Sequence, residues 1–214
     1  MTLKISEIFY SIQGESLYGG LPCIFVRLTG CNLRCSYCDT TYAHETGELL
    51  DIPEIFARIA SFNCRLIEIT GGEPLLQKET PVLISRLISA GYQVLLETNG
   101  SFDIGKVDHR CIKIMDIKCP SSGELLKNNL ENLNRLHPHD QIKFVIGNRE
   151  DYQYACKTLK HIPPGLPGGN VLFSPVSGIL NPAELANWIL QDGLSVRLHL
   201  QLHKIIWPDI QRGV

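Results

Sequence analysis

Residues 66–100 read LIEITGGEPLLQKETPVLISRLISAGYQVLLETNG and contain two short apolar segments around a longer one. Leu66–Thr70 and Gln93–Thr98 are rich in β-branched and aliphatic residues, as buried strands are. Thr80–Ala90 has apolar residues at helical spacing, and Gly91 is suited to end that helix in the left-handed conformation. The stretch therefore predicts a strand–helix–strand unit on a parallel sheet.

The same alternation continues on both sides of this unit. Capping signals mark two more helices, at Asp51 with Glu54 and at Asn181-Pro182. Further strands are expected at Ile24–Leu28, Ile112–Ile117, Gln141–Ile146, Val171–Ser174 and Val196–Leu200, with an extra strand at Lys4–Tyr10. About six to seven strands are too few for a closed eight-fold barrel. We expect an α/β fold, an open, partial parallel β/α barrel, in a single domain over residues 1–214.

Composition narrows the functional classes. The chain has 214 residues and a net charge of −2, without any long run of like charge, which argues against a nucleic-acid-binding surface. No apolar segment is long enough to span a membrane, and the N-terminus lacks the pattern of a signal peptide. We expect a cytoplasmic protein without a membrane partner, whose eight cysteines are reduced thiols.

Unusual polar and glycine residues follow directly after four of the expected strands. They are Cys31 to Asp39, Gly71-Gly72-Glu73, Asn99-Gly100 and Lys118. In parallel α/β proteins the carboxyl ends of the strands share one edge, where catalytic loops gather. The sequence therefore places a candidate site at that edge.

Cys31, Cys35 and Cys38 lie within one loop. Four interpretations compete: a structural zinc site completed by His44, a redox dithiol, ordinary buried cysteines, and an iron–sulfur cluster. A structural zinc site usually has two well-separated pairs of ligands, and this sequence has no second Cys-x2-Cys pair. A redox dithiol would use Cys35 and Cys38 and leave Cys31 without a role. Ordinary buried cysteines are disfavoured because a polar loop buries little apolar surface. The pattern favours a 4Fe–4S cluster held by three thiolates, with one iron open to another ligand.

This Cys-x3-Cys-x2-Cys pattern, with Tyr37 before the last cysteine, resembles the signature of the radical S-adenosylmethionine (SAM) superfamily. The resemblance implies that the methionine end of SAM chelates the open iron. Gly71-Gly72-Glu73-Pro74 resembles the motif that receives the methionine amino group. By the same resemblance, the residues expected at the cofactor are Tyr37, Cys38, Asp39, Gly72, Glu73, Glu97, Asn99, Lys118, Cys119, Pro120 and Ser174.

Longer segments resemble the 7-carboxy-7-deazaguanine synthase family, namely Ile8–Ser16, Phe25–Arg27, Cys38–Thr40, Gln201–Trp207 and Arg212–Val214. That resemblance implies conversion of 6-carboxy-5,6,7,8-tetrahydropterin to 7-carboxy-7-deazaguanine, with loss of ammonia, on the 7-deazapurine route to queuosine. It also implies a 4Fe–4S cluster, SAM and Mg²⁺ as cofactors.

The site residues can be matched to that substrate. Gln13 and Glu15 suit the donor–acceptor edge of a pterin, and Arg27 with His203 suits a carboxylate. The full set expected at the substrate is Ile12, Gln13, Gly14, Glu15, Arg27, Thr70 and His203. Thr40 is the Mg²⁺ candidate by resemblance, with Asp39 as its rival. No residue is assigned as a general base.

Two other functions remain open at this stage. One is a radical SAM activase that makes a glycyl radical on a partner protein, and the other is a zinc-stabilised binding module. For a synthase we expect a flavodoxin- or ferredoxin-type reductant and a homodimer. The segment Thr41–Leu50 has no role that the sequence suggests.

Overall fold

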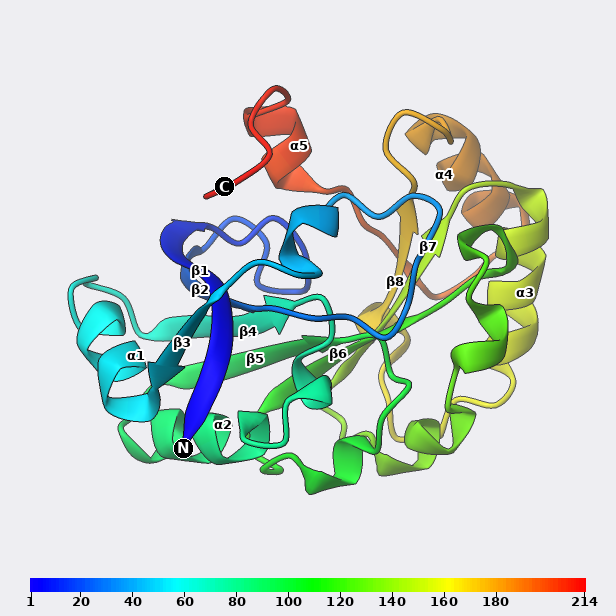
Figure 1. Cartoon of the computed structure of the whole chain (residues 1–214). Helices are drawn as coiled ribbons and strands as arrows, with labels where there is room; N and C mark the ends of the chain where they lie inside the picture. The colour runs from blue at the N-terminus through cyan, green and yellow to red at the C-terminus, as the bar shows by residue number, and fades with distance from the viewer.

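The computed structural model describes residues 1–214 and is built on one nine-stranded sheet with the order β3-β1-β2-β4-β5-β6-β7-β8-β9 (Figure 1). The strands from β2 to β9, apart from β3, are all parallel, whereas β1 is antiparallel to both β2 and β3. Their bounds are β1 Thr2–Ile12, β2 Pro22–Leu28, β3 Glu48–Asp51, β4 Leu66–Gly71, β5 Gln93–Thr98, β6 Ile112–Ile117, β7 Gln141–Ile146, β8 Val171–Pro175 and β9 Arg197–Leu198. The sheet curves but has two free edges, which confirms the expected open, partial barrel.

Helices cover the outer face of this sheet (Figure 1). They are α1 Ile52–Ile59, α2 Thr80–Ser89, α3 Arg149–Leu159 and α4 Pro182–Gln191, whereas the short α5 Leu202–Ile206 lies above the strand ends. The expected start signals are present: Asp51 and Glu54 form a reciprocal capping box, and the Asn181 side chain accepts from the Ala183 N–H at 2.9 Å. Gly91 follows α2 with φ +86°. Only 3-10 turns join β5 to β6 and β6 to β7.

Each parallel strand separates two environments because its side chains alternate between the two faces of the sheet. On β4, Ile67 and Ile69 belong to the core under α1 and α2, whereas Glu68 and Thr70 belong to the opposite, inner face. Away from the carboxyl ends of the strands, the inner face carries a small apolar cluster that contains Phe25, Leu95 and Ile114. Towards the carboxyl ends it carries charged residues, and this is where the site lies.

Three elements differ from the expectation. The short strand β3 was not expected; it forms because Glu48–Asp51 pairs with Thr2–Ile5 of β1. The edge strand β9 is shorter than Val196–Leu200, and α5 has no helical signal strong enough to predict it. Among the helices of the structure, none combines the length and apolar composition of a membrane span.

Candidate active site

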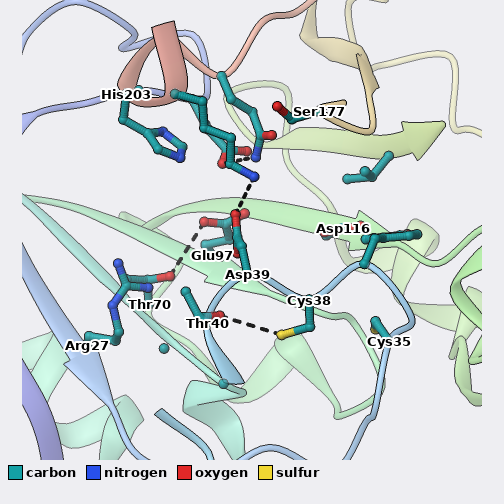
Figure 2. Close-up of a pocket in the computed structure, with 18 of the residues that line it drawn as sticks. Arg27, Cys35, Cys38, Asp39, Thr40, Thr70, Glu97, Asp116, Ser177 and His203 are labelled. Carbon is teal, nitrogen blue, oxygen red and sulfur yellow. Dashed lines mark hydrogen bonds and ion pairs between the residues drawn. The ribbon is translucent and has the colours of Figure 1, made fainter. Parts of the chain in front are cut away.

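A cavity of about 810 Å³ opens at the carboxyl edge of the parallel strands, under α5 (Figure 2). Its volume lies within the range of roughly 300–1,000 Å³ that small-molecule sites occupy. Most of the expected site residues line it: Ile12, Gln13, Gly14, Glu15, Arg27, Cys31, Cys35, Tyr37, Cys38, Asp39, Thr40, Thr70, Gly72, Glu97, Asn99, Lys118 and His203. The expected residues outside its lining are Glu73, Cys119, Pro120 and Ser174. The fold therefore brings together segments from almost the whole chain.

The cysteine loop is held against the ends of two strands. The Glu73 N–H donates to the Gly30 carbonyl at 2.8 Å, and Asn99 Nδ2 donates to Asn32 Oδ1 at 3.1 Å. A Cβ at Gly72 would clash with the Gly30 carbonyl and with Cys31, so only glycine permits this approach. The loop presents Cys31, Cys35 and Cys38 as free, partly exposed thiols.

These thiols fit an iron–sulfur cluster through their chemistry. Thiolates are the ligands of such clusters, and all three line one cavity without forming a disulfide. Burial raises the pKa of Cys31 and Cys35 above the ordinary thiol value. Metal binding has to displace these protons, so assembly of a cluster here is coupled to thiol deprotonation.

Glu73 has a second task that the sequence did not indicate. Its carboxylate is fully buried and accepts from the Leu75 N–H at 2.9 Å, the Asn99 N–H at 2.7 Å and the Thr98 hydroxyl. Burial raises its pKa to about 7, although these hydrogen bonds act in the opposite direction. Glu73 thus ties the end of β4 to the end of β5, and its contact with the cofactor stays a prediction.

Gln13 and Glu15 follow β1 and enter the cavity from one side. Gln13 Oε1 accepts from the Glu15 N–H at 2.8 Å, while Gln13 Nε2 donates to the buried carboxylate of Glu68. Glu15 is paired with Lys143 at 2.8 Å and accepts from Gln201 Nε2 at 2.9 Å. Burial would raise the pKa of Glu15, but the charges of Lys143 and His203 outweigh it, so the pKa falls below its usual value.

Arg27 is oriented by two residues from other elements. Its Nε donates to Glu7 Oε1 on β1 at 2.7 Å, and the Tyr42 hydroxyl donates to the same oxygen at 2.8 Å. The ring of Phe9 lies under the guanidinium, 5.7 Å from its carbon to the ring centroid. The two terminal nitrogens of Arg27 make no hydrogen bond within the protein and are free for an anion. Tyr42 gives the segment Thr41–Leu50 the role that the sequence did not suggest.

The helix α5 contributes His203 and Lys204 to the cavity lining. Figure 2 shows Asp39 reaching towards α5, where it pairs with Lys204 at 2.6 Å, and His203 facing the cavity from the same helix. His203 packs directly on Gly14, because a Cβ at that position would meet the imidazole Nδ1. The Asp39–Lys204 pair links the cysteine loop to the segment near the C-terminus.

Sequence reasoning missed three charged residues of the site. Glu68 on β4, Asp116 on β6 and Lys143 on β7 all line the cavity, and all are nearly inaccessible to solvent. Each stands inside a mostly apolar strand rather than after it. A charged residue at an inward position of a buried strand was the available signal, since burial of an unpaired charge is costly.

The superfamily is decided by a match over the middle of the chain. The Radical SAM superfamily model matches residues 25–163, from β2 through α3 and including all three site cysteines. The chain belongs to the radical SAM superfamily. Its enzymes use a 4Fe–4S cluster and SAM, the two cofactors that the cysteine loop and the neighbouring strand ends predicted.

Closer similarity defines the family within it. The chain is 46% identical to a 7-carboxy-7-deazaguanine synthase from Koribacter versatilis over 99% of this chain and 100% of that protein. It is 47% identical to the Chlorobaculum tepidum synthase, over 99% of this chain and 97% of that protein. The chain therefore also belongs to the 7-carboxy-7-deazaguanine synthase family, which removes the zinc-stabilised module as an interpretation.

The fold agrees with this assignment. The crystal structure of QueE from Escherichia coli superposes with a TM-score of 0.72 at 22% identity, and the match covers 94% of each chain. At this identity the likeness concerns the fold alone. It shows that the two proteins share the same overall fold.

Proposed function

We propose that this chain is a 7-carboxy-7-deazaguanine synthase that acts on 6-carboxy-5,6,7,8-tetrahydropterin. The observation that carries the proposal is that one cavity is lined by the three-cysteine loop and by two groups suited to the ends of this substrate. Gln13 and Glu15 form a donor–acceptor edge, and Arg27 and His203, which both line the cavity, are the groups assigned to the substrate carboxylate. A binding module would not need these groups beside a cluster.

In this proposal the polar edge of the pterin binds at Gln13 and Glu15. An ionised Glu15 accepts from the N–H groups of an aminopyrimidinone, and each of its oxygens keeps lone pairs beyond those used by Lys143 and Gln201. The substrate carboxylate binds the two free terminal nitrogens of Arg27, whose plane is set by Glu7. Two fixed ends leave a planar substrate only one orientation.

The residues nearest the thiols suit the cofactor. Asp116 Oδ1 and the Tyr37 hydroxyl are buried without a hydrogen-bond partner, and Lys118 Nζ lies 2.9 Å from Asp116 Oδ2. These groups, with Glu97 and Asn99, would hold the polar parts of SAM. When bound, the cluster and SAM supply a radical able to take a hydrogen atom from carbon. The residues of this chain orient C6 of the substrate and exclude water, and no general base is needed for that step.

Thr40 is the proposed Mg²⁺ ligand. Asp39 is the rival, but its carboxylate is engaged by Lys204, whereas the Thr40 hydroxyl has only a long 3.8 Å contact to Cys38 Sγ. Magnesium often keeps several waters, so one protein oxygen beside the substrate carboxylate is a sufficient anchor. Thr40→Ala should therefore raise the Mg²⁺ concentration needed for half-maximal turnover, while SAM affinity stays unchanged.

The remaining partners follow from the proposed reaction. A flavodoxin- or ferredoxin-type reductant would supply the electron, and a homodimer in the cytoplasm is the proposed working form. Each of these can be tested separately from the chemistry, by reductant-dependent turnover and by sedimentation of the reconstituted protein.

The decisive experiment is anaerobic turnover of the reconstituted protein with dithionite, SAM, Mg²⁺ and the carboxytetrahydropterin, with products identified by mass spectrometry. We expect the deazaguanine acid from the wild type and none from Cys31→Ala, Cys35→Ala or Cys38→Ala. 5′-Deoxyadenosine without the acid product would show radical chemistry on another substrate. An activase would keep partner activation in Arg27→Ala, whereas the synthase should lose turnover of its small acid.

A further inference from the structure

Lys143 stands at the centre of the charged part of the cavity. Its ammonium contacts carboxylates from three other elements: Glu15 at 2.8 Å after β1, Glu97 on β5, and Asp116 on β6 at 3.7 Å. Only 4% of its side chain is exposed. The roles derived above use Lys143 only as the ion-pair partner of Glu15.

Without Lys143, the acidic side chains around it would lack a positive charge to balance them. Glu15, Glu68, Glu97 and Asp116 all line the same inner face. Asp116 has a nearer cation, because Lys118 Nζ lies 2.9 Å from its Oδ2. Lys143 is therefore the ammonium that serves both Glu15 and Glu97.

Glu68 shows what happens here to a carboxylate that has no cation of its own. Burial, followed by the charges of Glu97 and Glu15, raises the pKa of Glu68 well above the ordinary value. Glu15 is buried beside the same groups, yet Lys143 and His203 lower its pKa. His199 also faces Glu15 but its own pKa is lowered, first by burial. The contrast between Glu68 and Glu15 is thus produced mainly by Lys143.

We propose that Lys143 is a positioning residue that keeps Glu15 ionised, and therefore a hydrogen-bond acceptor, while bridging it to Glu97. This inference rests on the proposed function for the identity of the ligand at Glu15. An ionised Glu15 accepts from the 2-amino group and N3–H of a pterin, whereas a protonated Glu15 would donate. Lys143 thereby determines specificity for a 2-amino-4-oxo ring over a 2,4-dioxo ring. Through Glu97 it also connects the substrate edge to the cofactor side of the cavity.

The test compares Lys143→Met with a matched control. Lys113→Met also removes a buried, ion-paired lysine, but Lys113 pairs with Asp140 at 3.0 Å and does not line the cavity. The probes are 6-carboxypterin and 6-carboxylumazine, which differ in an amino or an oxo group at C2. Their intrinsic fluorescence reports equilibrium binding to the reconstituted holoenzyme with SAM, without turnover.

We expect Lys143→Met to weaken 6-carboxypterin binding by about 30-fold or more, as truncation of a buried charge partner does. Binding of 6-carboxylumazine should change by less than about threefold, so the preference for pterin collapses. Lys143→Arg should recover most of the preference, and Lys113→Met should retain all of it. Equal weakening of both probes, or an unchanged preference in Lys143→Met, would overturn the inference.

A second readout keeps the inference separate from the substrate assignment. SAM affinity, measured by equilibrium dialysis, should fall about tenfold in Lys143→Met and stay unchanged in Lys113→Met, because only the former leaves Glu97 without its cation. If the wild type binds neither pteridine, the proposed substrate is wrong, and the SAM measurement alone decides whether Lys143 supports Glu97. Wild-type SAM affinity in Lys143→Met would then refute the bridge.

Discussion

Two buried lysines on adjacent strands have opposite consequences for the molecule. Lys113 on β6 and Lys143 on β7 are both almost inaccessible to solvent and both pair with carboxylates. Lys113 lies outside the cavity lining and meets one aspartate whose oxygens are otherwise used by backbone N–H groups. Lys143 lies in the cavity and meets several carboxylates that keep acceptor capacity.

The difference teaches how a structural ion pair can be told from a functional one. Asp140 accepts from the N–H groups of Lys113 and His137, both at 2.8 Å, in addition to the Lys113 ammonium. The Asp140–Lys113 pair is closed, in that its hydrogen-bonding groups are used within the protein, and its loss should change stability alone. The group around Lys143 is open, in that its carboxylates can still accept hydrogen bonds from a ligand in the cavity, so its loss should change binding. Burial and ion pairing by themselves do not separate the two cases.

The largest expected effect breaks the closed pair. Asp140→Ala leaves a buried ammonium and two backbone donors without their acceptor, so the free energy of unfolding should fall by about 3–5 kcal/mol. Urea unfolding of the reconstituted protein measures this loss. The kcat/KM of the folded fraction should remain that of the wild type. A fall in kcat/KM would mean that the outer face also serves the site.

The next effect concerns the open side. Arg27→Ala removes the proposed partner of the substrate carboxylate and should cost roughly 2–4 kcal/mol of binding, or about 30- to 1,000-fold in kcat/KM. The unfolding free energy should fall less than in Asp140→Ala, because Glu7 keeps its hydrogen bond from Tyr42 and both side chains of the Arg27–Glu7 pair are partly exposed. Steady-state kinetics and urea unfolding on the same samples test this. A large stability loss with normal kinetics would reverse the comparison.

A smaller effect depends on pH. Burial raises the pKa of Glu73 from 4.5 to about 7, so its contribution to stability is full below about pH 4.5 and is lost as the pH rises through 7. The wild type should lose roughly 2–3 kcal/mol relative to Glu73→Gln between pH 5 and pH 8. If the SAM ammonium binds Glu73, SAM should restore stability at pH 8 more than at pH 5. Parallel pH curves for both proteins would contradict this assignment.

The smallest effect provides a baseline at the surface. Arg58 and Glu48 form a 2.8 Å pair whose side chains are 46% and 61% exposed. Arg58→Ala should change the free energy of unfolding by less than about 0.5 kcal/mol. Its kinetics should match those of the wild type. A larger change in the free energy of unfolding would show that this exposed ion pair stabilises the protein as much as the buried Lys113–Asp140 pair does.

Much of the fold could be predicted from local patterns. The expected strands Gln93–Thr98, Ile112–Ile117 and Gln141–Ile146 match the structure residue for residue. They succeed because buried parallel strands have a strong, local apolar signal. The strand β3 could not be predicted, because its partner is Thr2–Ile5 and only long-range pairing makes it a strand.

The site divides in the same way. The sequence by itself determined the three thiols, the Gly71-Gly72 turn and the polar residues after four of the strands, because their spacing in the chain is the signal. Only the tertiary structure decided that Lys143 joins Glu15 to Glu97 and that Tyr42 and Glu7 orient Arg27. These contacts unite residues far apart in the chain. Their energies depend on burial and on distances in space, which no local pattern records.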